Sequence, residues 1–235
     1  MKKSGIVGNW HGLVRCECCS IHQAALFSVI PIEILAKMHL PIEDIQFNAG
    51  ASLYNAGCEG SAIFTIRSGF VKLSRFLPNG NYRIVRLARH GGVLGLETLL
   101  GSPYEHTATA LSPTFTCRIP RDIVYELALS YQELYQQIMQ RFCDAVHQAD
   151  EWLTLLATGS IRARVARLFL YLEDKPHNSL CTLLGREDIA AILGTTPETT
   201  SRIIADLKRS GAIQHLGLNR FRCNIQMLNT IAKQS

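Results

Sequence analysis

Short hydrophobic runs separated by glycines dominate the segment between residues 45 and 120. Runs such as Ile63–Ile66, Phe70–Leu73 and Arg83–Leu87 are rich in residues that favour strands, and turn residues bound them. The sharpest turn signal is Pro78–Gly80, which places a hairpin between Lys72–Phe76 and Tyr82–Leu87. Short strands at this density predict a compact antiparallel barrel or sandwich.

After Pro120 the spacing of apolar residues changes from that of strands to that of helices. They recur at alternating steps of four and three, which is the a/d seam of a coiled coil. These positions are Tyr131, Tyr135, Ile138, Phe142, Ala145, Ala149, Trp152 and Leu156. Such a seam extends for about 40 Å at 1.5 Å per residue, which is longer than a small barrel can cover. Self-pairing is therefore favoured over packing on the chain's own barrel, and we expect all of these residues except Tyr131 to form a homodimer interface.

The last third of the chain predicts short helices that end in a hairpin. A helix over Ile161–Leu172 has one apolar face, and two further helices meet at a tight corner around Gly194. Thr196 is placed to cap the second helix of this pair, with a proline at its first helical position. Gly211 ends that helix, and residues 213–225 form a β-hairpin, the wing.

Charge points to a polyanion as the partner of this last third. The net charge of +5 lies wholly there, because residues 160–235 hold 11 Lys/Arg and 6 Asp/Glu, whereas residues 1–159 hold 13 of each. Phosphate neutralisation supplies most non-specific affinity for nucleic acids, so we expect the C-terminal domain to bind DNA. The alternative is that these charges are scattered over the surface and only interact with water.

Composition excludes several other classes of protein. No run approaches the roughly 18 apolar residues of a membrane span, and the first ten residues lack the apolar core of a secretory signal. We therefore expect a cytoplasmic protein with no membrane partner. The sequence contains no zinc spacing, phosphate-binding loop or nucleophile elbow, so we do not expect an enzyme.

Three polar residues share one face of the helix that follows Gly194. Glu198, Ser201 and Arg202 are three and four residues apart and lie opposite the isoleucines of that helix. Arg can grip guanine O6 and N7, Glu can accept from cytosine N4, and Ser suits either base. The alternative is that these three residues form an ordinary solvent-exposed helix face. The surrounding helix-turn-helix pattern favours base recognition over this alternative. The expected contacts to double-stranded DNA are Thr196, Glu198, Thr199, Ser201, Arg202 and Lys208.

The motif Glu198-x-x-Ser201-Arg202 resembles the recognition signature of the FNR branch of the CRP/FNR regulators. The resemblance extends over nearly the whole chain, and Ile66–Gly69 and Gly95–Glu97 are similar to landmarks of that family's cyclic-nucleotide-binding β-roll. It implies an α+β fold with an N-terminal β-roll of the jelly-roll type, a long dimerisation helix and a C-terminal winged helix-turn-helix. It also implies a half-site close to TTGAT rather than the TGTGA of the cyclic-AMP branch, and RNA polymerase as a partner.

These considerations divide the chain into four parts. We expect a cysteine-containing segment at residues 1–25, a β-roll sensory domain at 26–120, the dimerisation helix at 121–157 and the winged helix-turn-helix DNA-binding domain at 158–235.

Cyclic AMP is not the expected ligand of the β-roll. In family members that bind it, a Glu meets the ribose hydroxyl and a later Arg-Ser pair meets the cyclic phosphate. Glu97 matches the first of these. At the positions that resemble those of the Arg-Ser pair, this chain has His106 and Thr107. A buried phosphate without its arginine loses charge-assisted hydrogen bonds worth about 1.5 to 3 kcal/mol each.

Cysteines near both ends of the sensory domain resemble the ligands of the oxygen-labile [4Fe-4S] cluster of the FNR branch. Cys16-x-x-Cys19 matches the first pair of N-terminal ligands, and Cys117 lies in a segment similar to the one that holds the internal ligand. The third N-terminal ligand is missing from its usual places, and Cys18 is the candidate substitute. The resemblance therefore implies a cluster held by Cys16, Cys18, Cys19 and Cys117.

Two alternatives to a cluster stay open at this point. Two of the cysteines could form a regulatory disulfide, or none could have a redox role. Irregular spacing in a reducing compartment argues against a disulfide scaffold. The other four cysteines, which we interpret as small core or surface residues, are Cys58, Cys143, Cys181 and Cys223.

The sequence thus predicts a homodimeric, sequence-specific transcription regulator. The resemblance implies an activator that responds to oxygen or redox state. An alternative within the family is a regulator without a cluster that senses nitric oxide or another small ligand. A cyclic-nucleotide-binding module of a signalling protein is the alternative from another class, and the C-terminal helix-turn-helix argues against it.

Overall fold

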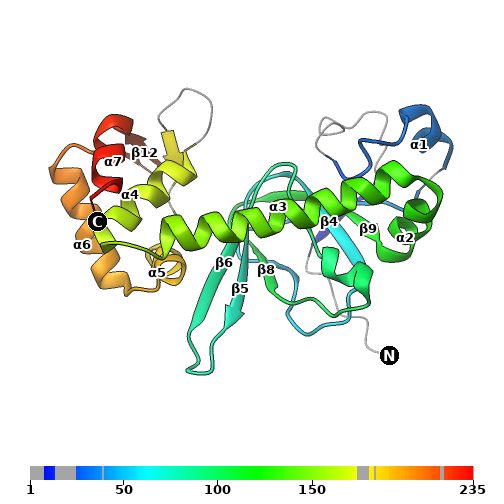
Figure 1. Cartoon of the computed structure of the whole chain (residues 1–235), viewed down its shortest axis with the longest axis horizontal. Helices are drawn as coiled ribbons and strands as arrows, with labels where there is room; N and C mark the ends of the chain where they lie inside the picture. Colours follow the sequence, from blue (N-terminus) through cyan, green and yellow to red (C-terminus); the bar gives the residue numbers. More distant parts are fainter. Residues whose placement is uncertain are drawn as a thin grey trace. The chain divides into compact units, whose positions relative to one another are not determined.

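The chain forms two compact units, which we describe separately. The computed structural model describes residues 8–13, 25–38, 40–173, 180–182, 184–217 and 220–234. The first unit comprises Met1–Pro78 and Val85–His147, and the second comprises Asn79–Ile84 and Gln148–Ser235. In Figure 1 the helices after α3 are coloured from yellow to red and belong to the second unit.

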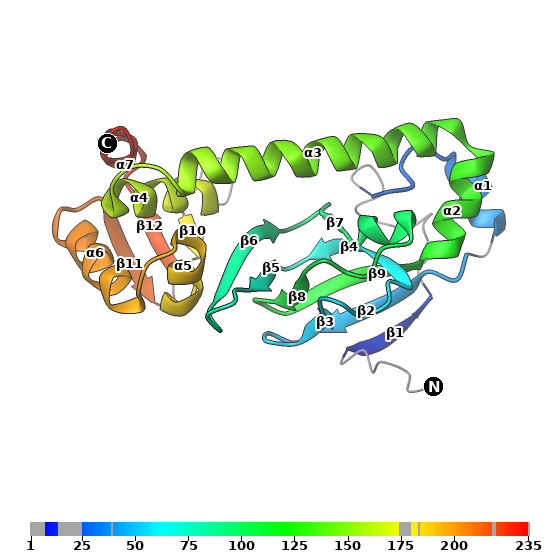
Figure 2. The ribbon, with the colours of Figure 1, turned by 60° about the horizontal axis from the view of Figure 1, so that its bottom comes forward.

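Two antiparallel sheets make up the first unit (Figure 2). The larger sheet has the strand order β1-β2-β9-β4-β7, and the smaller has the order β3-β8-β5-β6. The elements are β1 Asn9–Leu13, β2 Glu43–Phe47, β3 Ser52–Tyr54, β4 Ala62–Ser68, β5 Val71–Phe76, β6 Tyr82–Ala88, β7 Val93–Leu94, the 3-10 helix η3 Leu96–Leu100, β8 Thr107–Ala110 and β9 Thr114–Pro120. A turn that includes Pro78 and Gly80 separates β5 from β6, as the sequence predicts. The β-rich fold predicted from the glycine-punctuated runs is therefore confirmed.

Apolar side chains from both sheets form one core. Phe47 and Phe64 from the larger sheet and Leu73 from the smaller one belong to the same buried cluster. The rings of Tyr54 and Tyr104 stack within this cluster, with their centroids 3.9 Å apart. Alternation along the strands directs these residues inward, which is the period-2 pattern of a half-buried sheet.

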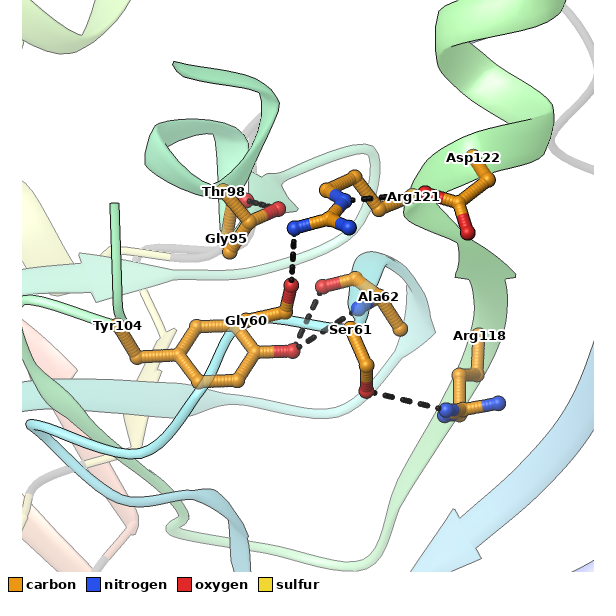
Figure 3. Close-up of polar contacts among 9 residues, drawn as sticks. All are labelled: Gly60, Ser61, Ala62, Gly95, Thr98, Tyr104, Arg118, Arg121 and Asp122. Atoms are coloured by element: carbon orange, nitrogen blue, oxygen red, sulfur yellow. Dashed lines mark hydrogen bonds and ion pairs between the residues drawn. The ribbon is translucent and has the colours of Figure 1, made fainter. Parts of the chain in front are cut away.

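Hydrogen bonds of Tyr104 hold the loop between η3 and β8 against the start of β4 (Figure 3). The Tyr104 hydroxyl donates to the Ala62 carbonyl at 2.7 Å and accepts from the Ala62 N–H at 3.3 Å. Burial raises the pKa of Tyr104, so the hydroxyl keeps the proton that it donates. A Cβ at Gly60 would lie 2.1 Å from Thr98 Cγ2, so only glycine fits beside η3. The loop before β4 and η3 are thus packed together.

The helical segment after β9 is broken into two helices. α2 covers Arg121–Ser130 and α3 covers Gln132–Leu156, and both follow the short helix α1, Ile32–Met38. The break is at Tyr131, whose backbone is extended at φ −126° and ψ 104°. Sequence periodicity predicts helix on both sides of this residue but does not show the break.

α3 carries two apolar faces. One face is buried in the chain itself, where Leu134 and Ile138 join the core of the first unit and Trp152 packs edge-on against Tyr171 in the second. The other face is exposed and includes Tyr135, Met139, Val146 and Leu153. The heptad pattern placed Ile138, Trp152 and Leu156 in the dimer interface together with Tyr135. The structure instead buries those three within one chain.

The second unit combines helices with a small sheet whose strand order is β10-β12-β11. Its elements are α4 Ile161–Leu172, β10 Leu180–Thr182, α5 Arg186–Leu193, α6 Pro197–Arg209, β11 Ile213–Gly217, β12 Arg220–Cys223 and α7 Ile225–Ala232. Phe169 of α4 meets Phe221 of β12 edge-on, with ring centroids 5.6 Å apart. The predicted helix over Ile161–Leu172, the helix pair around Gly194 and the terminal hairpin are confirmed.

The C-terminal helix α7 was not predicted. The sequence-based hairpin extends to Ile225, but β12 ends at Cys223, and the Asn224 side chain caps α7 by accepting from the Met227 N–H at 3.1 Å. Asn at an N-cap is a recognisable start signal, so this helix could have been found. None of the helices in the described parts of the chain is long and apolar enough to cross a membrane.

Candidate nucleic-acid interface

A tight corner between α5 and α6 sets the position of the candidate recognition helix. Gly194 ends α5 in the left-handed conformation, with φ 60°, which glycine adopts without steric cost. Thr196 then caps α6, because its side chain accepts from the Thr199 N–H at 3.2 Å. Pro197 follows at the first helical position. The N-terminal turn of α6 therefore begins as the sequence predicts.

α6 separates a buried face from an exposed polar face. Thr200, Ile204 and Leu207 are almost fully buried, whereas Glu198, Ser201 and Arg202 are exposed. The Arg202 guanidinium makes no ion pair with any residue that the structure describes. The three residues predicted to read bases thus share one solvent-facing surface on α6, which we call the recognition face.

The Glu198 carboxylate is held in its charged form. Hydrogen bonds from its own backbone N–H and from the Thr196 side chain lower the pKa of Glu198 below its usual value. A group with a lowered pKa keeps its charge as the pH falls until that lowered value is reached. Glu198 therefore remains an acceptor at and below neutral pH.

Two other predicted DNA contacts have roles inside the domain. The Thr196 hydroxyl oxygen serves as the cap of α6 by accepting from the Thr199 N–H at 3.2 Å. The Lys208 ammonium lies over the ring of Phe221, 5.3 Å from its centroid, while the residue itself remains exposed. Lys208 therefore links α6 to the wing.

The wing adds two cations that the sequence analysis did not single out. Arg220 and Arg222 are exposed on β12, and they alternate with the buried Phe221 and Cys223. This Arg-Phe-Arg-Cys alternation is visible in the sequence as a half-buried strand with a basic outer face. A basic hairpin beside a recognition helix suits contacts to DNA phosphates.

Two arginines of α4 close the C-terminal ends of three other helices. Arg164 donates through Nε to the Leu156 carbonyl at the end of α3, at 2.7 Å, and through Nη2 to the Leu193 carbonyl at the end of α5. Arg167 donates to the Ala232 carbonyl at the end of α7, at 2.9 Å, and to the Leu155 carbonyl at 3.1 Å. These carbonyls lack partners within their helices and carry the negative end of the helix dipole. We call this pair the arginine clasp.

The arginine clasp is crowded with positive charge. The pKa of Arg164 is lowered by burial and by the nearby guanidiniums of Arg83 and Arg167. None of the three helices that it closes has a basic residue of its own in its last turn. α4 therefore supplies the cations that these helix ends lack. An ion pair between Arg162 and Asp206, 3.0 Å long, also ties α4 to α6.

Of the four predicted metal ligands, the structure describes only one. Cys16, Cys18 and Cys19 lie outside the described residues. Cys117 is in β9, buried in a cluster with Leu26 and other apolar residues. Within the described ranges no group of three or more His, Cys, Asp or Glu side chains could hold a metal ion.

The proposed nucleotide slot contains a histidine beside two arginines. Burial, followed by the charge of Arg86, lowers the pKa of His106, and Arg75 acts in the same direction. Thr107 Oγ1 accepts from the Ala56 N–H at 3.1 Å, and the Glu97 carboxylate accepts from the Glu105 N–H at 3.3 Å. Arg75 and Arg86 come from β5 and β6, so the sequence around Glu97 and His106 gives no sign of them.

Two family models match most of the chain. Residues 44–131 match a cyclic nucleotide-binding domain, and residues 163–230 match a Crp-like helix-turn-helix domain. Among curated relatives, the Fumarate and nitrate reduction regulatory protein of Vibrio cholerae is 27% identical over 205 residues, which cover 84% of this chain and 82% of that protein. Electron transport regulator A of Shewanella oneidensis is 26% identical over 215 residues, with 87% and 84% covered.

Solved structures show the same fold. FixK2 from Bradyrhizobium japonicum has a TM-score of 0.76 and 21% identity, and the match covers 83% of this chain and all of that one (100%). A transcriptional regulator of the CRP family from Thermus thermophilus has a TM-score of 0.70 and 23% identity, with 81% and 97% covered. The relatives are named as regulators, which confirms the expectation that the chain is not an enzyme.

The arginine clasp should be a main support of the second unit. Replacing Arg164 with Met removes hydrogen bonds from a cation to two helix ends and should lower the local free energy of unfolding by about 2 to 3 kcal/mol. Arg164→Lys should recover only part of this, because an ammonium lacks the forked geometry. Native-state hydrogen exchange at amides of α4 and α7 measures the effect. Arg209→Met, at an exposed arginine, is the control, and equal losses in the two Met variants would contradict the assignment.

Proposed function

Because this chain belongs to the CRP/FNR family of DNA-binding transcription regulators, we propose that it binds a TTGAT-type palindrome as a homodimer and activates transcription in response to oxygen or redox state. The observation that supports operator recognition is the recognition face of α6, where Glu198, Ser201 and Arg202 are exposed together. Their side chains offer the groups that read base edges in the major groove. A cytoplasmic location and RNA polymerase as a partner are parts of the same proposal.

The names of the relatives suggest which genes are controlled. One relative is named for fumarate and nitrate reduction, one for electron transport, and others are named anaerobic regulatory proteins. We infer that this chain controls genes for respiration at low oxygen. Cyclic AMP is not part of the proposal, because His106 and Thr107 stand where an Arg-Ser pair would meet its phosphate.

Homodimer formation is supported by the exposed face of α3. Val146 and Leu153 are 60% and 61% exposed, and Tyr135 is 57% exposed. An apolar stripe on a long helix is unfavourable in water and is typical of a self-pairing surface. Its members are Tyr135, Met139, Phe142, Val146, Ala149 and Leu153, at alternating steps of four and three. This set keeps Tyr135, Phe142 and Ala149 of the sequence-based interface, although Phe142 is half-buried and also packs against the core. It leaves out the buried Ile138, Trp152 and Leu156 and the half-buried Ala145, which lies off the stripe.

A cluster is supported by the position of Cys117. Its side chain is buried beside Leu26 and Phe27, which lie at the start of the segment described after residue 24. Ala25 is six positions after Cys19, and an extended chain over that interval reaches about 20 Å. Three thiols close together in sequence and the Cys117 thiol make up the four-thiolate donor set that a [4Fe-4S] cluster takes, so the residues present fit this group.

We assign the ligands Cys16, Cys18, Cys19 and Cys117. When bound, a [4Fe-4S] cluster supplies an oxygen-labile redox group. The thiolates of the chain would tie the N-terminal segment to β9, next to the core that also contains Leu134 and Ile138 of α3. Loss of this tie changes the stability of the packing under α3, and this difference between the two states carries the signal.

Operator choice should depend on Arg202. Arg202→Ala should weaken binding to a TTGAT palindrome by about 1 to 3 kcal/mol and relax selection at the guanine that it reads. Fluorescence anisotropy with TTGAT and TGTGA palindromes at matched salt measures both effects. Arg209→Ala, at the exposed end of α6, should weaken binding to both sequences alike. Equal affinity of the unmodified protein for the two palindromes would contradict the proposed preference for TTGAT.

A charge on the exposed face of α3 should separate the subunits. Val146→Asp buries a carboxylate in the proposed interface and should shift sedimentation from dimer to monomer, with loss of operator binding. His147→Asp adds a carboxylate at the next residue, which lies away from the stripe, and should remain dimeric. If Val146→Asp sediments as a dimer with unchanged affinity, the subunits pair through another surface.

Iron should bind to the protein through Cys117. Anaerobic reconstitution should give a broad absorption near about 400 nm that bleaches in air, with iron and sulfide in equal amounts. Cys117→Ser should lack this absorption, while Cys143→Ser, at an exposed cysteine of α3, should keep it. Failure of the unmodified protein to take up iron and sulfide would refute the cluster and favour a regulator that senses a small ligand in the β-roll.

A further inference from the structure

Two cysteines are neighbours on the buried face of the sheet in the second unit. Cys181 in β10 and Cys223 at the end of β12 are 1% and 4% exposed. Cys181 lies opposite Phe221 in the antiparallel register, so Cys223, two residues farther along β12, is its diagonal neighbour on the same face. Both are reduced thiols, and their side chains hydrogen-bond to each other. Thiols in contact on adjacent strands can be joined when the strands shift locally.

Cys223 is the candidate nucleophile of the pair. Its hydrogen bond with Cys181 lowers the pKa of Cys223, although burial and the nearby Glu173 act in the opposite direction. The thiolate is the nucleophile in thiol oxidation, so a lowered pKa favours attack by this sulfur. Cys223 also directly precedes Asn224, the N-cap of α7, and the positive end of a helix favours an anion there. Cys181 is then in place to resolve the oxidised intermediate.

We propose that Cys181 and Cys223 form a reversible disulfide when the protein meets a peroxide, and that this bond disturbs the wing. The Cys223 thiolate attacks one peroxide oxygen, the O–O bond breaks, and the leaving oxygen takes a proton to become water or an alcohol. The sulfenic acid left on Cys223 is then attacked by the Cys181 sulfur. The S–O bond breaks and a molecule of water leaves with the remaining protons. Two electrons pass from the two sulfurs to the peroxide.

The position of β10 explains how buried thiols can react. β10 is an edge strand of three residues, paired with β12 on one side and with only a single bridge, from Cys181 to Glu173, on the other among the residues that the structure describes. Short edge strands open locally at little cost in free energy, which admits a small oxidant. Larger thiol reagents should react more slowly at this pair than at the exposed Cys143.

The geometry of the bond explains its effect on the wing. A disulfide needs its Cα atoms about 4.4 to 6.8 Å apart, whereas diagonal neighbours in a sheet have their Cα atoms about 7 to 8 Å apart. Closing the bond therefore draws β10 along β12, the strand that presents Arg220 and Arg222. Strained disulfides are readily reduced, which is the behaviour of a switch rather than a structural bridge. This effect on DNA rests on the proposed function, but formation of the bond does not.

Peptide mapping tests the bond itself. The full-length protein is treated with hydrogen peroxide, alkylated and digested with trypsin without reduction. The expected product is a cross-linked pair of the peptides 168–186 and 223–233, which disappears after dithiothreitol treatment and is absent from Cys181→Ser and Cys223→Ser. Recovery of both peptides as alkylated thiols, under conditions that oxidise Cys143, would overturn the proposal.

Operator binding tests the effect on the wing. Peroxide should weaken binding of the unmodified protein by about tenfold, because a charge-assisted phosphate contact is lost, and dithiothreitol should restore it. Cys143→Ser should respond in the same way, while Cys181→Ser should not respond. If the bond forms and affinity stays constant, the regulatory effect is refuted. If the reduced protein binds no palindrome, the proposed function fails, and the peptide map still decides the bond.

Discussion

The guanidinium groups of α4 satisfy carbonyls that three helices leave without partners. Each helix ends with unpaired C=O groups and a partial negative charge, and such an end cannot be buried unless a donor meets it. Arg164 and Arg167 supply these donors to α3, α5 and α7 at once. The corner before α6, the end of the long helix and the C-terminal helix are therefore placed by the same two side chains. The orientation of the recognition face depends on this arrangement.

α3 has two apolar faces, whereas the heptad pattern in the sequence predicts a single seam. One apolar face is buried in the chain itself, and the other remains exposed over most of the helix. Because both faces belong to one helix, the packing of the inner face and the position of the outer one are physically coupled. In the proposed dimer, the helix that packs on the core of the first unit is also the helix that carries the interface.

Several features follow from local sequence alone. The cap at Thr196, the left-handed Gly194 and the polar face with Glu198 and Arg202 depend on residues within one or two turns of each other. The turn at Gly80 and the strands around it are local in the same sense. These features were predicted correctly because the physical causes lie within short stretches of chain.

Other features depend on residues that are distant in sequence, and only the tertiary structure could decide them. The seam from Tyr131 to Leu156 predicts a helix with apolar positions, but which of these meet the chain's own core is decided by what packs beside them. The arginines near His106 and the partners of Arg164 come from other elements of the fold. The same is true of Cys181 and Cys223, which strand pairing brings together. By itself, the sequence determined the helix-turn-helix and its polar face, because caps, turns and periodicity act locally. The tertiary structure decided which apolar faces, cations and thiols meet, because burial and pairing depend on the whole fold.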